Sequence, residues 1–327
     1  MKVLVVGLGS MGKRRIRLMK QHFGIERICG VDISEHRRRE ATDIFGITTF
    51  PTLVEALHVS YDCAFVCSAP LSHSKIITQC LTAGLHVFSE LNLIRDGYSE
   101  NICLAKEVQK TLFISSTLLY REDIHFLIKN IQENAYSLSY TYHVGQYLPD
   151  WHPWEHYNEY FVAEKSTGGC RELFAIELPW LLRAFGDVSD VSVHTHCMSR
   201  LVLPYPDTYL AYIEHKNGAV GQLMVDVVAR VPVRHFEVFG ETMQLEWRGV
   251  PEEVWTVTCD YSSMQRAAVD NEPMRQNGYR DFIVEDAYVE EIRAFSDTIQ
   301  GKHVPCYTFE DDLHTLQIVD EIMGVEY

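Results

Sequence analysis

A glycine-rich turn near the start of the chain has the residue types and spacing needed to bind the phosphates of a dinucleotide. The turn, Gly7 to Gly12, follows the apolar run Val3–Val6 and precedes a basic stretch with helical spacing. In such a turn the first glycine permits a tight bend, the second admits a pyrophosphate, and the third lets the helix pack closely. The helix N-terminus then faces the anionic phosphates. We therefore predict dinucleotide contacts from Gly7, Gly9, Ser10, Met11 and Gly12.

A carboxylate in the expected place favours NAD as the dinucleotide. Asp32 ends the next apolar run, at residues 28–31. There it can accept hydrogen bonds from the adenosine ribose, and it would repel a 2′-phosphate. NADP is the less favoured alternative, because Arg37, Arg38 and Arg39 follow and guanidinium groups suit a phosphate. Arg37 is also predicted to stack on the adenine.

A second group of chemically capable residues lies at 150–157, where aromatic side chains, prolines and histidines are concentrated. Trp151, Trp154 and Tyr157 would form a stiff aromatic platform suited to the apolar faces of a sugar ring. Imidazole titrates near neutrality, so His152 is the first candidate for a general base and His156 the second. The alternative is a packed loop whose histidines are satisfied by the backbone.

A carboxylate in an apolar helical pattern, Glu177 within residues 168–185, is the third candidate. A buried carboxylate must be paired or have a raised pKa, and a raised pKa would suit proton transfer. Pairing with Arg171 or Arg183 is the structural alternative. Arg171 and Glu172, in the first turn of the same helix, are predicted substrate contacts, unless they pair with each other or face solvent.

The elements that must position the dinucleotide turn follow from alternating strand and helix patterns over residues 1–120. Strands are predicted at 2–7, 27–32, 62–67, 85–89 and 112–116, and helices at 11–22, 35–45, 72–83 and 98–110. This alternation is typical of a parallel sheet covered by helices on both faces. We therefore predict an α/β chain whose first domain, residues 1–120, is a doubly wound Rossmann domain.

Residues 121–327 show a different pattern and are predicted to form a second, α+β domain with a large, open and mainly antiparallel sheet. Strands are expected near 136–146, 188–203, 208–216, 219–230, 233–240 and 242–247, with Lys216-Asn217-Gly218 as a hairpin turn. Helices are expected at 122–134, 168–185 and 285–300, and a long loop at 260–281. This domain would bind the substrate and form the oligomer contact.

Composition narrows the possible partners. A net charge of −16 argues against nucleic acid and anionic membranes, which require basic surface. No apolar run has the length of a membrane span. The nine cysteines are scattered through apolar segments, as expected of reduced thiols in the cytoplasm. No metal site is predicted, because Cys63 and Cys67 share one strand without a second cysteine pair.

Several motifs together resemble the Gfo/Idh/MocA oxidoreductase family. They are the Gly7 to Gly12 turn, Ala69-Pro70 with His73, the segment from Ala83 to Glu90, Gly168-Gly169, and residues 288–295. The resemblance implies hydride transfer between a nicotinamide and a carbon of a sugar, cyclitol or related compound. It also implies a homodimer or homotetramer built through the open sheet. The matching positions imply cofactor contacts from Ser68, Ala69, His73, Glu90 and Asn92.

The chain departs from the family at positions that carry catalysis. It reads Glu90-Leu91-Asn92 where the family has Glu-Lys-Pro, and leucine cannot assist proton transfer. The helical histidine of the family is Glu177 here, and the aspartate before it is Leu173. Residues 145–157 are similar to a branch associated with surface-polysaccharide sugars. Two hypotheses remain: an NAD-dependent sugar oxidoreductase that uses His152 or Glu177, or a catalytically inactive NAD-binding sensor.

Overall fold

The computed structural model describes residues 1–134, 137–152, 155–257, 260, 262–269, 273–276 and 282–325. It divides the chain into two compact units. The N-terminal unit comprises Met1–Thr117 and Tyr288–Leu313, and the C-terminal unit comprises Leu118–Ala287 and the residues from His314 on. The sequence-based boundary at residue 120 did not anticipate that Tyr288–Leu313 joins the first unit. Such a return is a long-range contact that leaves no local signal in the sequence.

The N-terminal unit is built on a six-stranded, fully parallel sheet with the order β3-β2-β1-β4-β5-β6. Its two central strands are buried along their whole length, which explains why they read as continuous apolar runs instead of alternating. This is the predicted doubly wound Rossmann sheet. The strands are β1 (Val3–Val6), β2 (Ile28–Val31), β3 (Thr48–Phe50), β4 (Cys63–Val66), β5 (His86–Ser89) and β6 (Leu112–Ile114).

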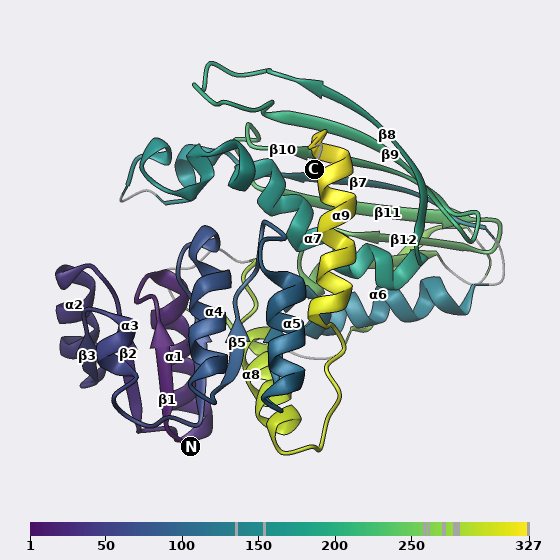
Figure 1. Cartoon of the computed structure of the whole chain (residues 1–327). Coiled ribbons are helices and arrows are strands. Elements are labelled where there is room, and N and C mark those ends of the chain that lie inside the picture. Colours follow the sequence, from purple (N-terminus) through teal and green to yellow (C-terminus); the bar gives the residue numbers. More distant parts are fainter. Residues whose placement is uncertain are drawn as a thin grey trace. The chain divides into compact units, whose positions relative to one another are not determined.

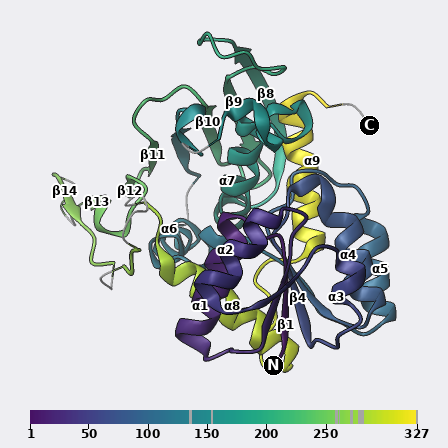
Figure 2. The same ribbon diagram turned by 90° about the vertical axis from the view of Figure 1, so that its left-hand side faces the viewer.

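Helices cover both faces of this sheet. Figure 2 shows α1, α2 and α8 on one side of the strands, with α4 and α5 on the other. Phe295 of α8 packs edge-on against Phe65, Phe88 and Phe113 of three neighbouring strands, with ring centroids 5.4 to 5.6 Å apart. The helices are α1 (Ser10–Phe23), α2 (Glu35–Phe45), α3 (Leu53–Ala56), α4 (His73–Thr82), α5 (Tyr98–Glu107) and α8 (Glu285–Ile299).

The C-terminal unit contains an eight-stranded sheet with the order β14-β13-β12-β11-β7-β10-β9-β8 (Figure 1). β7 and β10 are parallel, and all other neighbours are antiparallel, which confirms the mainly antiparallel prediction. The strands are β7 (Ser139–Gly145), β8 (Val188–His196), β9 (Thr208–His215), β10 (Val220–Asp226), β11 (Val233–Gly240), β12 (Met243–Trp247), β13 (Val254–Val257) and β14 (Met264–Arg266). The prediction of a long loop at 260–281 was wrong at Met264–Arg266, where β14 lies.

One face of this sheet holds the core of the C-terminal unit. Tyr140 and Tyr142 of β7 point inward and contact Phe185 and Trp180 of α7, while Thr141 between them is exposed. This alternation is the two-residue period of a sheet with one covered face. The helices that belong to this unit are α6 (Glu122–Glu133), α7 (Gly169–Phe185) and the part of α9 (Phe309–Met323) that follows Leu313.

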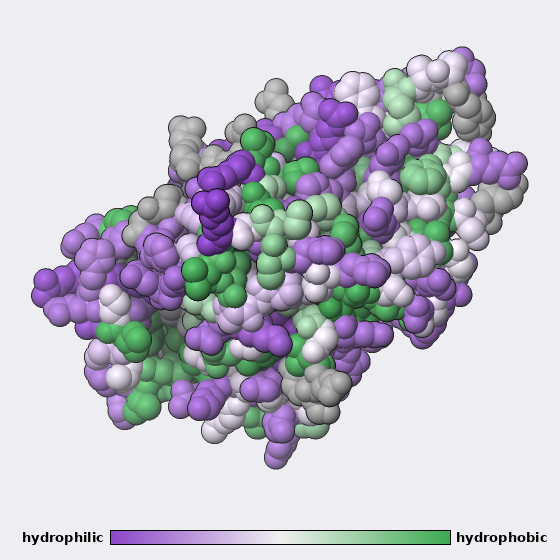
Figure 3. Space-filling model, turned by 90° about the horizontal axis from the view of Figure 1, so that it is seen from above, coloured by the Kyte–Doolittle hydropathy of each residue, from purple (hydrophilic) through white to green (hydrophobic). Residues whose placement is uncertain are grey.

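The surface and the helix lengths bear on possible partners. In the view of Figure 3, hydrophobic residues form small groups separated by hydrophilic ones. Within the part of the chain that the structure describes, no helix combines the length and apolar character required to cross a membrane.

Candidate cofactor and substrate sites

The glycine turn has the backbone geometry of a dinucleotide site. Gly7 has φ +96°, and a Cβ there would lie 2.6 Å from the Cys67 carbonyl group. A Cβ at Gly12 would lie 1.9 Å from the Gly7 carbonyl oxygen, so only glycine lets α1 begin this close to β1. At Gly9 the nearest atom is an Arg37 guanidinium nitrogen at 3.9 Å, which leaves room for a phosphate. Ser10 and Met11 form the first turn of α1.

Asp32 lies beside this turn, as predicted from its position after β2. Its carboxylate accepts hydrogen bonds from the backbone N–H groups of Leu8 and Ser34, both at 2.8 Å. Two of the three arginines weighed for a 2′-phosphate have other partners. Arg38 donates to the carbonyl groups of Asp32 and Ile33, and Arg39 pairs with Glu35. This geometry agrees with NAD.

The expected nicotinamide-side residues gather where β4 ends. Ser68 and Ala69 lie in the turn just after β4, and His73 begins α4. The carbonyl of Ser68 accepts a hydrogen bond from His73 Nε2 at 2.7 Å, and His73 Nδ1 lies 2.7 Å from Asn92 Oδ1. A Cβ on Gly7 would also lie 2.6 Å from the Ser68 nitrogen, so the two turns touch. Parallel sheets bind ligands at this kind of switch point, between the carboxyl ends of β1 and β4.

Glu90 lies in an ion-pair network that the sequence did not reveal. Its carboxylate receives Arg15 Nε at 2.6 Å, and the same guanidinium donates to Glu291 of α8 at 2.7 Å. Arg15 and Glu291 have fully buried side chains. Burial lowers the pKa of Arg15, but the two carboxylates raise it above its usual value overall, so it stays charged. The expected cofactor contact of Glu90 remains a prediction, and its observed partner is structural.

His152 and Glu155 form a histidine–carboxylate pair suited to proton transfer in the C-terminal unit. The imidazole Nδ1 lies 2.7 Å from Glu155 Oε1, and the two side chains are 30% and 25% exposed. The His152 ring stacks on Tyr160 with centroids 4.4 Å apart. A carboxylate at Nδ1 favours the tautomer that keeps the proton there and the lone pair on Nε2. This is the geometry of an oriented general base that solvent or a ligand can reach.

Glu172 lies in the same neighbourhood and is charged only at a cost. Its Oε2 atom and the Tyr160 hydroxyl are both buried and have no hydrogen-bond partner among the described residues. Burial raises the pKa of Glu172 to about 7. The Tyr160 pKa is raised by burial first and then by the charges of Glu172 and Glu155. Two polar groups without partners inside one cluster indicate a position where a ligand or water can bind.

Glu177 has a different environment from that of a general base. It is fully buried, and its oxygens accept hydrogen bonds from Tyr142, Trp180 and Arg234 at 2.7, 3.1 and 2.7 Å. The alternative pairing weighed from the sequence, with Arg171 or Arg183, is not what the structure shows. Arg171 is buried and bonds to Asp320 instead. Glu177 therefore orients Arg234, and its carboxylate is held by three donors.

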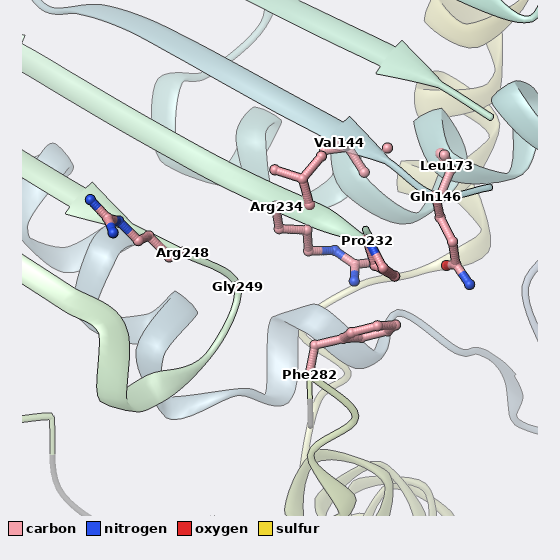
Figure 4. A pocket seen from close by; sticks show the side chains of 10 residues that line it. Val144, Gln146, Leu173, Pro232, Arg234, Arg248, Gly249 and Phe282 are labelled. Atoms are coloured by element: carbon pink, nitrogen blue, oxygen red, sulfur yellow. The ribbon is translucent and has the colours of Figure 1, made fainter. Parts of the chain in front are cut away.

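Arg234 lines a pocket at the end of the sheet (Figure 4). Its guanidinium lies 5.2 Å from the ring centroid of Phe282, and Gln146 and Pro232 lie beside it in the view. Leu173 of α7 also lines the pocket. At the position where the family carries an aspartate, Leu173 therefore forms an apolar part of the pocket wall. At the position where the family carries a histidine, the Glu177 carboxylate orients Arg234. Sequence reasoning missed this arginine as a site residue.

The remaining aromatic candidates are only partly brought together. Trp151 donates from Nε1 to the carbonyl of Gln146 at 3.3 Å, which joins the segment to the pocket wall. Tyr157 is buried, and its hydroxyl accepts from the Val202 N–H at 3.3 Å. His156 is exposed and stacks on Tyr157. Trp154 lies outside the described residues.

Comparison with known proteins agrees with this geometry. Residues 1–113 match the family model GFO_IDH_MocA, an oxidoreductase family with an NAD-binding Rossmann fold. No curated protein matches the chain.

Three solved structures share the fold over nearly the whole chain. One is GenD2 from gentamicin A biosynthesis in complex with NAD, with 19% identity, TM-score 0.80, and coverage of 99% of this chain and 93% of that chain. Another is UDP-N-acetylglucosamine 3-dehydrogenase GnnA from Acidithiobacillus ferrooxidans, with 15% identity and TM-score 0.75. The match covers 99% of this chain and 97% of that chain. The third is levoglucosan dehydrogenase in complex with NADH and L-sorbose, with 15% identity and TM-score 0.81. The match covers 99% of this chain and 96% of that chain.

At these identities the solved structures establish the fold, while the family match adds the cofactor. The matched segment contains the glycine turn, Asp32 and the turn that follows β4. Residues 1–113, which contain this segment, therefore match the Gfo/Idh/MocA oxidoreductase family model with its NAD-binding Rossmann fold.

Proposed function

We propose that the protein is an NAD-dependent oxidoreductase that transfers hydride between the nicotinamide and a carbinol or keto carbon of a sugar or sugar derivative. The observation that carries this proposal is the His152–Glu155 pair, hydrogen-bonded at 2.7 Å and partly exposed. It supplies the proton acceptor that Leu91 cannot supply. The dehydrogenases of levoglucosan and UDP-N-acetylglucosamine, which share the fold, support a sugar-like substrate.

When bound, NAD would supply the hydride acceptor for the oxidative direction. The carbinol hydroxyl would give its proton to His152 Nε2. Glu155 holds the Nδ1 proton and stabilises the imidazolium that forms. The Tyr160 ring fixes the plane of the imidazole by stacking. In the reductive direction the same imidazolium returns the proton.

Glu177 has a positioning role in this proposal. Because three donors hold its carboxylate, it orients Arg234 toward the pocket and is not assigned the proton transfer. Arg234, Gln146 and Phe282 would then contact the polar groups and one face of a ring.

The test is NADH formation by the purified protein with NAD and a panel of sugars, sugar phosphates and nucleotide sugars. With a substrate found, His152→Ala should lower kcat by about a hundredfold or more, the usual contribution of a general base. His156→Ala is the matched control, since this nearby histidine is exposed, and it should keep near-normal activity. Leu91→Lys should not raise the rate. A His152→Ala protein as active as the wild type would contradict the assignment.

One observation favours the second candidate, a catalytically inactive NAD-binding sensor. Leucines occupy positions 91 and 173, and Leu173 lines the pocket where the family has a carboxylate. A sensor would bind NADH tightly and change its affinity when a sugar is added, while the cofactor never changes redox state. That outcome would replace the oxidoreductase proposal.

We also propose self-association through the outer face of the C-terminal sheet. Glu237, Thr141, Gln222 and Tyr212 form one row across neighbouring strands, and Tyr212 is 45% exposed. Light scattering should give a dimer or larger for the wild type. Tyr212→Lys combined with Gln222→Lys should reduce the mass toward that of a monomer. A monomeric wild type would refute the interface.

A further inference from the structure

A continuous chain of buried hydrogen bonds in the N-terminal unit joins the end of β4 to a carboxylate on α9. It runs from the Ser68 carbonyl through His73, Asn92 and Tyr98 to Asp312. Asn92 Nδ2 donates to the Tyr98 hydroxyl at 2.8 Å, and that hydroxyl bonds directly to Asp312. His73, Asn92, Tyr98 and Asp312 are each exposed by 4% or less. Solvent therefore cannot replace a missing partner within the chain.

The chemistry of the groups restricts where the protons can be. A carbonyl only accepts, so His73 Nε2 must donate to Ser68. If Asp312 is ionised, Tyr98 donates to it, Asn92 donates to Tyr98, and His73 must carry protons on both nitrogens to meet Asn92 and Ser68. If Asp312 is protonated, it donates to Tyr98, the Asn92 amide turns over, and His73 stays neutral. The two arrangements contain the same number of protons.

Removing one proton from this chain leaves an unsatisfied contact. With Asp312 ionised and His73 neutral, two hydrogen-bond acceptors must face each other at one contact in the chain of hydrogen bonds. A hydrogen bond to a carboxylate is about twice as strong as a neutral one, so Tyr98 keeps donating to Asp312. The single imidazole hydrogen then moves to Nδ1 to meet Asn92, and the Ser68 carbonyl loses its donor. Loss of the proton from Asp312 thus removes the hydrogen bond to the Ser68 carbonyl, in the turn after β4.

Burial favours the neutral arrangement, in which the Asn92 amide is turned over relative to the orientation described above. Burial lowers the pKa of His73, while the Ser68 and Asn92 hydrogen bonds and the charge of Glu90 oppose that shift. Burial raises the pKa of Asp312 to about 6, and the neighbouring Asp311 adds to this, whereas the hydroxyls of Tyr98 and Tyr307 lower it. Tyr307 donates to the other Asp312 oxygen at 2.9 Å. Glu90 is itself paired with Arg15.

The Ser68 carbonyl lies where its orientation matters to a dinucleotide. The turn after β4 touches the glycine turn, because a Cβ on Gly7 would lie 2.6 Å from the Ser68 nitrogen. Asn92 is essential to the connection, since the amide bridges the imidazole and the phenol. Proline, the residue expected at position 92 from the family pattern, has no side-chain donor or acceptor.

We propose that His73, Asn92 and Asp312 are positioning residues for NAD: the protonated chain holds the Ser68 turn in the form that receives the dinucleotide, and affinity falls when Asp312 loses its proton. The inference rests on NAD binding alone. It stands whether or not the protein oxidises a sugar, so the two proposals can fail separately.

The test is the NADH dissociation constant, measured by fluorescence titration between pH 5.5 and 7.5. For the wild type we expect affinity to fall by about fivefold over this range, the value of one neutral hydrogen bond. Asp312→Asn should keep the low-pH affinity throughout, because its amide donates to Tyr98 at every pH. Asn92→Ala should show no pH dependence, because without the amide the charge of Asp312 no longer reaches His73 and the imidazole hydrogen stays on Nε2.

Asn101→Ala is the matched control. Asn101 is a buried amide of α5 that bonds to Ser74 and Thr78, outside this chain of hydrogen bonds. The variant should retain the pH dependence of the wild type. A wild-type affinity that is constant with pH, or an Asp312→Asn variant with the wild-type dependence, would overturn the proposal.

A spectroscopic measurement on the wild type keeps the test decisive if a variant does not fold. Nitrogen-15 NMR of histidine-labelled protein should show the His73 proton on Nε2 at pH 5.5 and on Nδ1 at pH 7.5. A tautomer that does not change over this range would refute the mechanism.

Discussion

Replacing Arg15 with methionine should destabilise the N-terminal unit strongly and in a pH-dependent way. Methionine keeps most of the side-chain length but removes the charge that lies between Glu90 and Glu291. The Arg15 side chain is fully buried and donates to both carboxylates, at 2.6 and 2.7 Å, so no water can take its place. Removing one partner of a buried ion pair costs about 3–5 kcal/mol, because the other charge is left without compensation.

The pH dependence of this variant has a definite sign. Burial already raises the pKa of Glu291, and the positive charge of Arg15 opposes that shift. Without Arg15 the pKa of Glu291 in the folded state rises further above its unfolded-state value. The folded variant is then least disfavoured when Glu291 is protonated, and it loses stability as pH rises through the folded-state pKa of Glu291. The deficit should therefore be smaller at pH 5 than at pH 7.5.

The assay is urea unfolding of Arg15→Met and the wild type at both pH values. Arg39→Met is the matched control, because Arg39 on α2 is 76% exposed and its pair with Glu35 lies on the surface. The control should have the unfolding midpoint of the wild type. An Arg15→Met midpoint equal to that of the control, or a deficit that grows toward pH 5, would refute the reasoning.

Three further predictions concern the cofactor turn and the Glu172 cluster. Gly12→Ala should weaken NADH binding by more than about tenfold, because its Cβ would lie 1.9 Å from the Gly7 carbonyl oxygen. Gly24→Ala is the control, because nothing lies within 4 Å of the added Cβ, and it should leave NADH binding unchanged. Equal NADH affinities of the Gly12→Ala and Gly24→Ala variants, measured by titration, would contradict the turn geometry. Asp32→Asn should shift the ratio of NAD to NADP affinity by about tenfold toward NADP, and an unchanged ratio would remove Asp32 from the specificity argument. Burial raises the Glu172 pKa to about 7, so stability falls as pH rises through this range. The Glu172→Gln variant should then be more stable than the wild type at pH 8, by up to about 3 kcal/mol, and should have a similar stability at pH 4. Equal thermal midpoints of the variant and the wild type at pH 8 would show that Glu172 is not buried as a charge.

The sequence predicted the elements that have a strong local signal. The first strand, the glycine turn and the first helix follow directly from an apolar run, glycine spacing and helical periodicity, and all three are confirmed. Short or edge elements were missed. β3 has three residues and is partly exposed, α3 has four residues, and β13 and β14 lie at one edge of the second sheet. Such elements are stabilised by neighbours that periodicity does not reveal. α9 was also missed, and its residues divide between the two units.

The candidate site shows the same division. Residue types alone pointed to His152 as a base and to Asp32 as the ribose contact, because their chemistry depends on the residue and its immediate context. The partner of Glu177 depended on which strand lies under α7, and Arg234 is 57 residues away in sequence. Arg15, the partner of Glu90, is 75 residues away from it in sequence, and Glu291, the second partner of Arg15, is 276 residues away from Arg15.

The sequence by itself determined that the chain has an NAD-binding turn, a doubly wound first domain and a mainly antiparallel second sheet. Only the tertiary structure decided which charges are paired, which histidines have carboxylate partners, and that Asn92 bridges an imidazole to a buried acid. The physical reason is the separation in sequence over which each effect acts. Glycine geometry and periodicity act between residues a few positions apart, whereas burial and ion pairing depend on segments that meet only after folding.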